Sequence, residues 1–513
     1  MAKTLANLLA VIPDNHILAK HGNQQTVISA PVVESSLDVE HGGVFVARKG
    51  LSTDGHQYID KAIQSGASVI VGEIEKDNLP VPYVQVQDAQ AVLGLLAAAY
   101  HDFPSRKLVI IGVTGTDGKT TTNHILHSIL KQADGIRAGF ISTISADFGD
   151  AVADTGFHVT TPSAPQVQAY LARMVEAGLT HCILEMTSHG LAQGRLNGVD
   201  IDVAVLTNVM HEHLDFHGSW ENYRDAKAIM FRMLYTSYRK EGIPKVAVIN
   251  ADDQSYNYFK AIPADNTVSY GIQHDAKYHA TDIHYHPAKT TFIVHDTLMK
   301  MQLVGEFNIS NVLAGISVAR ELDIDWDAIQ LGIASIDGIS GRMQRIDEGQ
   351  NFVAIVDFAH TPNALKRALE AGRTMLPKGN RLICVFGSAG LRDVEKRRMM
   401  AETSAQLADM TIITAEDPRT ESLDDILEMM AQGCLSQGGI EGETFIRVRD
   451  RGEAIYQACQ MAQAGDIVMA CGKGHEQSMC FGTVEHLWDD RDAMRSALRG
   501  KPLATLPTAT GEY

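Results

Sequence analysis

The sequence predicts an α/β protein of three domains, and three observations lead to this fold class. Short runs rich in β-branched residues recur along the chain, and stretches with helical periodicity separate them. A glycine-rich segment at residues 112–122 joins one of these runs to the helix that follows it. The 513 residues are also enough for about three domains of roughly 100–200 residues each.

Composition narrows the class of protein. Hydrophobic residues make up 45% and charged residues 21%, an ordinary balance for globular domains, while the net charge of −18 argues against nucleic acid or an anionic membrane as a partner. The six cysteines are scattered without a Cys-x-x-Cys pair, which fits reduced thiols. No apolar run reaches the roughly 20 residues of a membrane span, and no signal-peptide pattern is present. We therefore expect a cytoplasmic monomer that is not inserted in a membrane.

Residues 1–105 form the first expected domain, a small α/β unit. The apolar runs at 44–47 and 67–71 are typical of buried strands. Residues 89–100 have the pattern of a helix, and residues 101–105, which include a proline, are the expected linker to the next domain.

Residues 106–340 form the second expected domain. Residues 108–113 are a continuous β-branched run of the kind that a central parallel strand requires, and a helix follows from about Thr120. Further runs at 181–185, 203–207 and 246–250 alternate with helical segments, which predicts a doubly wound parallel sheet. Residues 276–305 contain alternating segments, so we expect an antiparallel patch at the edge of this domain.

Residues 341–513 form the third expected domain, again with a Rossmann-like alternation of strands and helices. We expect strands at 352–357, 382–386, 410–414 and 466–470, and helices at 362–375 and 394–408. The tail after Pro502 is expected to be frayed.

The glycine-rich segment is predicted to bind the phosphates of ATP. Gly115 and Gly118 let backbone N–H groups turn toward phosphate oxygens, and Lys119 adds positive charge there. The Thr120 hydroxyl can ligate Mg²⁺. Val113 stands where the usual spacing has a glycine, so the loop is a variant. A tight turn without a ligand would not require Lys-Thr-Thr after its glycine.

Polar residues also follow other strands of the second domain. Glu185 ends one predicted strand, and His211 and His213 follow another, at the sheet edge where doubly wound folds bind ligands. A carboxylate there can hold a metal ion. The two histidines resemble a zinc pair, but no cysteine or third histidine has suitable spacing, so a harder metal with one histidine ligand fits better. Lys227 lies on a predicted helix, where a lysine is normally solvated.

The third domain carries charged loops at three successive strand ends, and each loop also contains glycine or proline. Solvated helices would explain one such cluster more easily than three. The clusters are Arg392 with Lys396, Arg397 and Arg398, then Glu416 to Arg419, and Gly472 to Glu476. Thr361 and Pro362 are expected to cap a helix directly after Asp357 and His360.

Taken together, these motifs resemble those of the Mur ligases over essentially the whole chain. The segments that carry the resemblance are 115–121, 185–190, 208–215, 223–227, 305–311, 341–342 and 357–362. Residues 160–162, Gln193, Arg195, 417–419 and 472–476 are most similar to the members that add the third residue of the peptidoglycan stem, the UDP-N-acetylmuramoyl-tripeptide synthetases. The resemblance implies an N-terminal UDP-binding domain, a central ATPase domain and a C-terminal amino-acid-binding domain.

The same resemblance implies acyl-phosphate chemistry. ATP would phosphorylate the D-Glu carboxylate of UDP-MurNAc-L-Ala-D-Glu, and the amine of a diamino acid would then displace phosphate. Phosphorylation gives a poor electrophile a leaving group. Lys119 and Mg²⁺ would neutralise charge on the transferring phosphoryl group.

The resemblance also assigns residues by position. Catalytic roles fall on Lys119, Glu185, His213 and Lys227, and two Mg²⁺ sites would use Thr120, Glu185, His213 and Lys227 as a carbamate. ATP-binding positions are Gly115, Thr116, Asp117, Gly118, Lys119, Thr120, Thr121, Asn308, Arg342, Asp357 and His360. Positions for the UDP-linked substrate are Ser36, Thr160, Thr161, Thr187, Ser188, Gln193 and Arg195, with residues 51–53 near the uridine end. Positions for the amino acid are Arg392, Glu416, Asp417, Pro418, Arg419, Gly472 and Glu476.

The chain departs from the usual family motifs at several positions. Ser35-Ser36-Leu37 stands where the uridine site usually has Asp-Ser-Arg. Glu212 replaces the Asp before the metal-binding histidine, and Asp117 replaces an Asn of the phosphate loop.

The third amino acid depends on residues 416–419, which read Glu-Asp-Pro-Arg where enzymes that take meso-diaminopimelate have Asp-Asn-Pro-Arg. Arg419 is present and can pair with a distal carboxylate. Glu416 and Asp417 add negative charge that would suit the ammonium of L-lysine or L-ornithine. We favour meso-diaminopimelate.

Two other functions stay open from the sequence alone. Folylpolyglutamate synthase shares the fold and chemistry, but a pterin-binding chain has no need of residues 1–105 or of 160–162. A non-catalytic ATP-binding subunit has no need of Glu185, His213 and Lys227.

Overall fold

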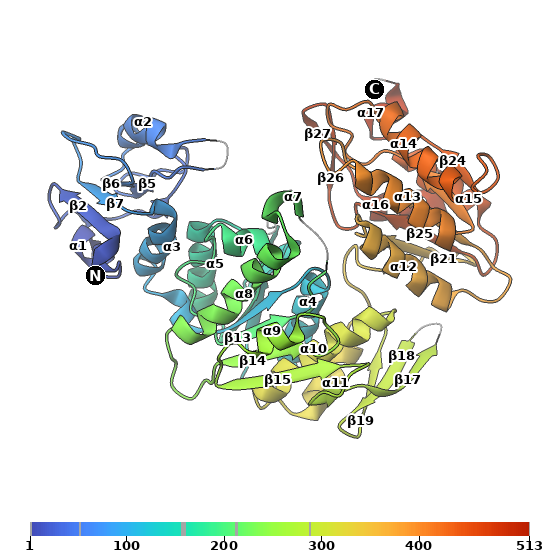
Figure 1. Cartoon of the computed structure of the whole chain (residues 1–513), viewed down its shortest axis with the longest axis horizontal. Coiled ribbons are helices and arrows are strands. Elements are labelled where there is room, and N and C mark those ends of the chain that lie inside the picture. Colours follow the sequence, from blue (N-terminus) through green and yellow to red (C-terminus); the bar gives the residue numbers. More distant parts are fainter. Residues whose placement is uncertain (1–2, 51–52, 155–160, 211–213, 287–288, 512–513) are drawn as a thin grey trace. The chain divides into compact units, whose positions relative to one another are not determined.

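The computed structural model describes residues 3–50, 53–154, 161–210, 214–286 and 289–511 (Figure 1). The chain divides into two compact units. The first comprises residues 1–278 with 313–329, and the second comprises residues 279–312 with 330–513. The domain boundaries expected at residues 105 and 340 stay predictions.

The N-terminal part of the first unit is built on a five-stranded sheet in the order β2-β7-β6-β5-β4. Strands β4 to β7 are parallel, and β2 joins antiparallel to β7. Valines of the sheet pack against leucines of a helix whose first turn is capped by Asp88. The elements are β1 (Lys3–Thr4), α1 (Leu5–Leu9), β2 (Ile17–His21), β3 (Val27–Ile28), β4 (Val32–Val33), β5 (Val44–Val46), α2 (Ile59–Gln64), β6 (Val69–Gly72), β7 (Tyr83–Val86) and α3 (Ala89–Tyr100). The predicted helix and both predicted strands are confirmed.

The first unit also contains a nine-stranded sheet in the order β11-β10-β9-β12-β8-β13-β14-β15-β16. Six neighbouring strands, β9 to β15 in this order, are parallel, and Ile111 of central β8 lies opposite both Ile183 and Val203. The strands are β8 (Val109–Thr114), β9 (Ala138–Ile141), β10 (Ser145–Asp147), β11 (Val152–Asp154), β12 (His181–Glu185), β13 (Val203–Leu206), β14 (Val246–Asn250), β15 (Asn266–Gly271) and β16 (Tyr278–His279). The predicted parallel sheet is confirmed.

Helices cover the nine-stranded sheet, and apolar residues of α5 and α8 pack with β8, β12 and β13 in one core. The helices are α4 (Lys119–Leu130), α5 (Ala164–Glu176), α6 (Ser188–Ala192), α7 (Leu214–His217), α8 (Trp220–Thr236), α9 (Tyr256–Lys260), α10 (Glu306–Glu321) and α11 (Trp326–Ala334). The last two cross between the units in sequence.

A buried charge cluster holds the amino ends of these strands. The Asp202 carboxylate accepts hydrogen bonds from the Ile110 N–H (2.8 Å), the Lys245 ammonium (3.0 Å) and the Lys240 ammonium. Lys240 also donates to the Leu108 carbonyl (2.5 Å). The predicted ligand-binding loops leave the opposite, carboxyl ends of the strands.

The second unit contains a six-stranded sheet in the order β20-β21-β25-β22-β23-β24, parallel except for β20. Its strands and helices are β20 (Gln344–Ile346), β21 (Val353–Asp357), α12 (Pro362–Met375), β22 (Leu382–Phe386), α13 (Glu395–Leu407), β23 (Met410–Ile413), α14 (Leu423–Ser436), β24 (Phe445–Arg447), α15 (Arg451–Met461), β25 (Ile467–Cys471), β26 (Ser478–Phe481), β27 (Val484–Leu487), α16 (Asp490–Leu498) and α17 (Pro507–Thr510). The predicted Rossmann-like alternation is confirmed.

Two expectations for the second unit need correction. The alternating segment before residue 305 forms its own antiparallel sheet and belongs to this unit, with strands β17 (Thr281–His286), β18 (Lys289–Val294) and β19 (Thr297–Met301). The chain also does not fray after Pro502, because Leu506 is buried in the core and Thr508 donates to Asp450 (2.7 Å).

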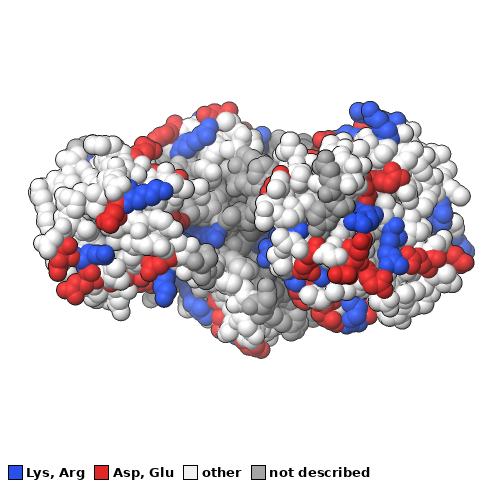
Figure 2. All heavy atoms as spheres, turned by 90° about the horizontal axis from the view of Figure 1, so that it is seen from above, with Lys and Arg blue, Asp and Glu red and all other residues white. Residues whose placement is uncertain are grey.

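Charges of both signs are interspersed on the face of the molecule shown in Figure 2, so the net charge of −18 is not gathered there into one acidic patch. No helix of the described residues has the length and apolar character needed to cross a bilayer.

Candidate active site

The predicted phosphate-binding loop lies between the end of β8 and the start of α4. Gly115 has φ +153° and Gly118 has φ +82°, conformations that L side chains rarely adopt. A Cβ on Gly115 would lie 1.8 Å from the Thr207 hydroxyl oxygen. Asn208 fixes the loop further, because its side chain accepts from the Asp117 N–H (2.9 Å) and donates to the Asp117 carbonyl (3.1 Å). Both glycines are therefore required by this loop.

Two lysines converge on the backbone of the loop. Lys119 donates to the carbonyls of Thr116 (2.8 Å) and Gly115 (3.1 Å). Lys227 also donates to the Gly115 carbonyl (2.6 Å), and its nitrogen lies 4.1 Å from the centre of the Tyr223 ring. The site therefore brings together the loop lysine and a lysine from α8, more than 100 residues later.

Lys227 is buried, with 1% of its surface exposed, so its interpretation as a solvated helix residue is wrong. Its position in α8 explains why. Tyr223, Ala226, Met230 and Phe231 are buried on the same helix, and Lys227 falls within their three- and four-residue spacing. This periodicity was the signal in the sequence that could have indicated its burial.

Glu185 lies beside the loop because β12 and β8 are neighbouring parallel strands. Its buried carboxylate accepts from the hydroxyl of Thr120 (2.9 Å), the hydroxyl of Thr143 (2.9 Å) and the Thr143 N–H (3.2 Å). Carboxylate and hydroxyl oxygens are the ligands that Mg²⁺ prefers, so these residues fit the predicted ion. Thr143 was missed in the sequence because β9, the strand that precedes it, was not predicted. His213 lies outside the described residues.

A second set of predicted residues, for the UDP-linked substrate, surrounds α6. The hydroxyls of Thr161 and Thr187 lie 2.9 Å apart. Arg195 donates to the Thr161 carbonyl (2.7 Å) and to Gln193 (3.0 Å), and burial lowers its pKa. The Ser188 hydroxyl lies 3.1 Å from a ring nitrogen of His217. The structure therefore brings four of the predicted positions together.

A small cavity connects this set to the N-terminal part of the unit. It is lined by Glu34, Arg48, Gln90, Leu93, Ala164, Gln193, Gly194 and Arg195. Ser36 is buried two residues after Glu34. Thr160 and residues 51–52 lie outside the described residues.

The remaining predicted nucleotide positions lie in the second unit. The Arg342 guanidinium lies 4.4 Å from the centre of the Phe358 ring, and a ring nitrogen of His360 lies 2.9 Å from the Phe358 carbonyl. The Asp357 carboxylate accepts from the N–H groups of Met343 (2.6 Å) and Ala359 (2.8 Å), so it orders the segments on both sides.

Asn308, also predicted to bind nucleotide, is buried at the start of α10. It donates to the Val304 carbonyl (2.7 Å) and accepts from the Asn311 amide (3.1 Å). These contacts fix the orientation of its side-chain amide.

His475 adds a buried ring to the cluster around Phe358. The two ring centres lie 4.8 Å apart. Burial, reinforced by the nearby cations Arg342 and Arg491, lowers the pKa of His475 to about 2. This imidazole is therefore neutral at physiological pH and adds no charge to the site.

The predicted amino-acid positions meet at the carboxyl ends of β23 and β25. Both oxygens of Asp417 accept from the Lys473 ammonium (3.1 and 3.0 Å), and Asp417 also accepts from the Cys480 N–H (2.9 Å). Glu476 lies 2.5 Å from the same ammonium. Although burial alone would lower the pKa of Lys473, Glu476 and Asp417 raise it. The negative charge of Asp417 is therefore balanced within the protein.

The loops around these residues adopt unusual backbone conformations. Leu391 (φ +54°), Asp417 (φ +41°) and Arg419 (φ +53°) all lie in the left-handed region. Each such residue costs on the order of 1–3 kcal/mol and persists only where its surroundings impose it. Arg419 donates to the Gly390 carbonyl (3.3 Å), two residues from Arg392, so the loops carrying both arginines are in contact.

Gly472 and Glu416 are in close contact. Gly472 has φ +114°, and a Cβ there would lie 2.1 Å from an oxygen of the Glu416 carboxylate. Glu416 is buried, and burial raises its pKa. Only glycine at position 472 leaves room for this carboxylate.

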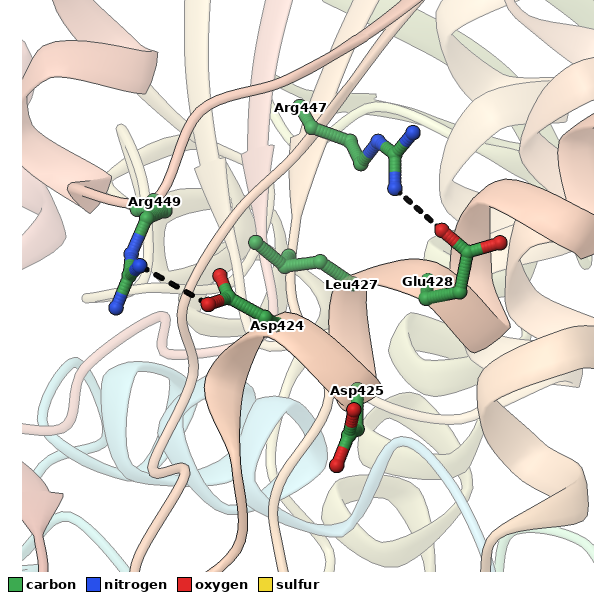
Figure 3. Close-up of a pocket in the computed structure, with 6 residues that line it drawn as sticks. All are labelled: Asp424, Asp425, Leu427, Glu428, Arg447 and Arg449. Atoms are coloured by element: carbon green, nitrogen blue, oxygen red, sulfur yellow. Dashed lines mark hydrogen bonds and ion pairs between the residues drawn. The ribbon is translucent and has the colours of Figure 1, made fainter.

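A larger hollow of about 460 Å³ lies elsewhere in the second unit, between α14 and the end of β24 (Figure 3). Arg447 lies 2.6 Å from Glu428, and Arg449 lies 3.0 Å from Asp424, so its cations are paired with its own acids. It contains none of the predicted site residues, and we do not assign it to the active site.

Comparison with known families covers most of the chain. Residues 35–101 match the family described as Mur ligase family, catalytic domain, residues 113–319 match Mur ligase middle domain, and residues 341–474 match Mur ligase, glutamate ligase domain.

Whole proteins give the same result. A UDP-N-acetylmuramyl-tripeptide synthetase of Roseiflexus sp. is 38% identical over 483 residues, covering 91% of this chain and 94% of that protein. A UDP-N-acetylmuramoyl-L-alanyl-D-glutamate–2,6-diaminopimelate ligase of Geobacillus kaustophilus is 36% identical over 499 residues, covering 96% and 99%. A solved structure with the latter description matches with a TM-score of 0.68 and 30% identity, covering 97% of this chain and 99% of that chain.

Folylpolyglutamate synthase, the rival function, is a more distant match. The enzyme of Mycobacterium tuberculosis has a TM-score of 0.58 at 14% identity, covering 79% of this chain and 95% of that chain, which shows a shared fold alone. On the three domain matches and the two whole-length relatives, the chain belongs to the Mur ligase family, whose members are ATP-dependent, ADP-forming amide ligases.

Proposed function

We propose that this ligase adds meso-diaminopimelate to UDP-MurNAc-L-Ala-D-Glu in the cytoplasm, as a monomer, with ATP and two Mg²⁺ ions. The observation that carries the proposal is the pairing of Thr120 with Glu185 beside the Lys119 loop. Together with relatives that are named for this reaction and cover nearly the whole chain, it supports phosphoryl transfer to a carboxylate substrate.

The chemistry follows from the residues beside the loop. Lys119 would bind the transferring phosphoryl group, and Thr120, Glu185 and His213 would supply oxygen and nitrogen ligands to the metal ions. A Mg²⁺ ion would supply neutralisation of phosphate charge. Thr161, Thr187 and Arg195 would orient the UDP-linked dipeptide so that its D-Glu carboxylate meets the phosphoryl group.

Lys227 would act as a carbamate and thus as an anionic ligand. Its burial supports this role, because a carbamate formed in a water-poor site is protected from hydrolysis. The Lys227 ammonium now donates to the Gly115 carbonyl, and a carbamate oxygen would be an acceptor. Modification would therefore also change the contact between α8 and the loop.

The choice of diaminopimelate rests on two charges. Arg419 offers a cation for a distal carboxylate, in addition to Arg392. Asp417 would favour a substrate ammonium if its charge were free to act, but Lys473 holds both of its oxygens. This pairing removes the main sequence argument for L-lysine or L-ornithine.

A substrate panel tests the proposal. Purified enzyme is given ATP, Mg²⁺, UDP-MurNAc-L-Ala-D-Glu and, in parallel, meso-diaminopimelate, L-lysine or L-ornithine, and phosphate release is measured. We expect release only when dipeptide and amino acid are both present, with the highest kcat/KM for diaminopimelate.

Variants identify the residue that selects the amino acid. Arg419→Ala is expected to raise the KM for diaminopimelate at least tenfold, while Arg449→Ala, an exposed arginine of the same domain, serves as the matched control. Higher kcat/KM with lysine than with diaminopimelate, or phosphate release that ignores the dipeptide, would count against the proposal.

A further inference from the structure

One fully buried arginine joins two loops of the predicted amino-acid site. Arg451, the first residue of α15, has none of its side chain exposed. It donates to the carbonyl of Cys471 (2.8 Å) and more weakly to that of Ala415 (3.4 Å). Cys471 directly precedes Gly472, and Ala415 directly precedes Glu416. A single guanidinium therefore spans the carboxyl ends of two strands.

Asp490 holds this guanidinium in place. Its two oxygens accept from Nε and Nη2 of Arg451, both at 2.7 Å, in the bidentate geometry that fixes a guanidinium plane. The Trp488 indole N–H donates to the same carboxylate (2.8 Å). Asp490 is itself fully buried, and it raises the pKa of Arg451 against the effect of burial. The guanidinium is therefore charged and has a fixed orientation.

The spacing that Arg451 sets is the spacing on which Glu416 depends. The Glu416 carboxylate occupies the space left by the missing side chain of Gly472. A small shift of either loop would move this carboxylate or close that space. Since the two loops leave different strands, local backbone structure alone does not fix the distance between them.

Arg451 also acts on the charge of Glu416. Burial raises the pKa of Glu416, and three nearby cations, Lys396, Arg451 and Lys473, oppose that effect. Of these three, Arg451 is the one whose contacts shown here are with Asp490 and the two strand ends.

A second arginine–aspartate pair in the same sheet provides the comparison. Arg381 donates twice to Asp466 (3.1 and 2.9 Å) at the amino ends of β22 and β25. This pair joins the same sheet at its other edge and touches no predicted substrate loop. It shows what a purely structural pair of this type looks like here.

We propose that Arg451, held by Asp490, is a positioning residue for the amino-acid substrate, which fixes the Glu416 and Gly472 loops at the distance that binding requires. This inference rests on the proposed function, since it takes residues 416–419 and 472–476 as the amino-acid site.

The test compares Michaelis constants in full-length enzyme. Arg451→Lys keeps the charge but loses the planar fork that reaches two carbonyls and Asp490 together. We expect the KM for diaminopimelate to rise about tenfold, with the KM values for ATP and dipeptide and kcat within about twofold of the native values. Arg381→Lys, the matched control, is expected to leave all three KM values unchanged.

Two further variants keep the test decisive if Arg451→Lys folds poorly. Trp488→Phe removes one hydrogen bond to Asp490 and is expected to raise the same KM by a smaller factor. Arg451→Gln removes the cation, so the KM for diaminopimelate should fall as pH rises, because Glu416 then ionises only at higher pH.

The outcomes separate the two proposals. If the native enzyme uses none of the amino acids, the proposed function fails. If the native enzyme is active but Arg451→Lys and Trp488→Phe leave the amino-acid KM unchanged, or raise the KM for ATP equally, the positioning role is overturned.

Discussion

Replacement of Lys227 by methionine separates a structural from a catalytic role for this buried side chain. Methionine has similar length and fills the same space, but it cannot donate to the Gly115 carbonyl or carry a carbamate. The lost hydrogen bond from a charged donor is worth about 1.5–3 kcal/mol, and the contact with the Tyr223 ring adds about 0.5–2 kcal/mol.

A compensating term reduces the expected loss of stability. Burying an ammonium costs several kcal/mol, and methionine avoids that cost. We therefore expect the free energy of unfolding to change by no more than about 2 kcal/mol. If Lys227 carries a metal-binding carbamate, kcat should nevertheless fall by about 10³ or more, because the loss of one electrostatic stabiliser costs roughly 10²–10³ and a metal position is lost with it.

The assay measures phosphate release at saturating substrates beside denaturant unfolding of the same preparations. Lys245→Met is the matched control, because Lys245 is as buried as Lys227 but lies at the amino ends of the strands. It should lose stability and keep its kcat. Short carboxylic acids should partly restore activity to Lys227→Ala. A kcat within about tenfold of native in Lys227→Met would refute the catalytic role.

Three other substitutions test the loops. Gly472→Ala should lower stability by roughly 1–3 kcal/mol and raise the KM for the amino acid, whereas Gly482→Ala, with open space at its Cβ and a similar positive φ, should lose stability only; equal KM values in both would contradict the crowding argument. Gly115→Ala should abolish nucleotide binding in a fluorescence titration that Gly135→Ala leaves intact, and retained binding would show that the loop can relax. The pKa of Glu416 is raised above 4.5, so the folded chain holds that proton longer than the unfolded chain and stability falls as pH rises above 4.5; Glu416→Gln should be the more stable chain by a margin that grows between pH 5 and pH 8 in denaturant unfolding, and a constant margin would contradict burial as the cause.

The parts of the fold that the sequence predicted best are those fixed by local pattern. The strand at 181–185 and the helix at 362–375 match the structure residue for residue, because unbroken apolar runs and a Thr-Pro cap depend on neighbours in sequence. The strand at 138–141 was missed, since it is short and two of its four residues are glycine and alanine. Its absence hid Thr143, which lies just beyond it.

The chemistry of the site was harder to predict because it depends on distant pairs. Asp417 and Lys473 are 56 positions apart, and only the meeting of β23 and β25 loops shows that one neutralises the other. Arg451 attracted no notice in the sequence, because an arginine at a helix start is usually solvated. Its burial follows from packing between two strand ends, which no periodicity records.

The lysine–aspartate cluster at the amino ends of the nine-stranded sheet has a consequence for how the molecule opens. Asp202 accepts from the Ile110 amide with its side chain, and its backbone N–H and carbonyl pair with Ile110 and Val246. These amides should therefore be among the last in the first unit to exchange their hydrogens with solvent. The glycine-rich loop at the opposite ends of the same strands can then open and close many times while this edge stays folded, so that each catalytic cycle begins from the same frame.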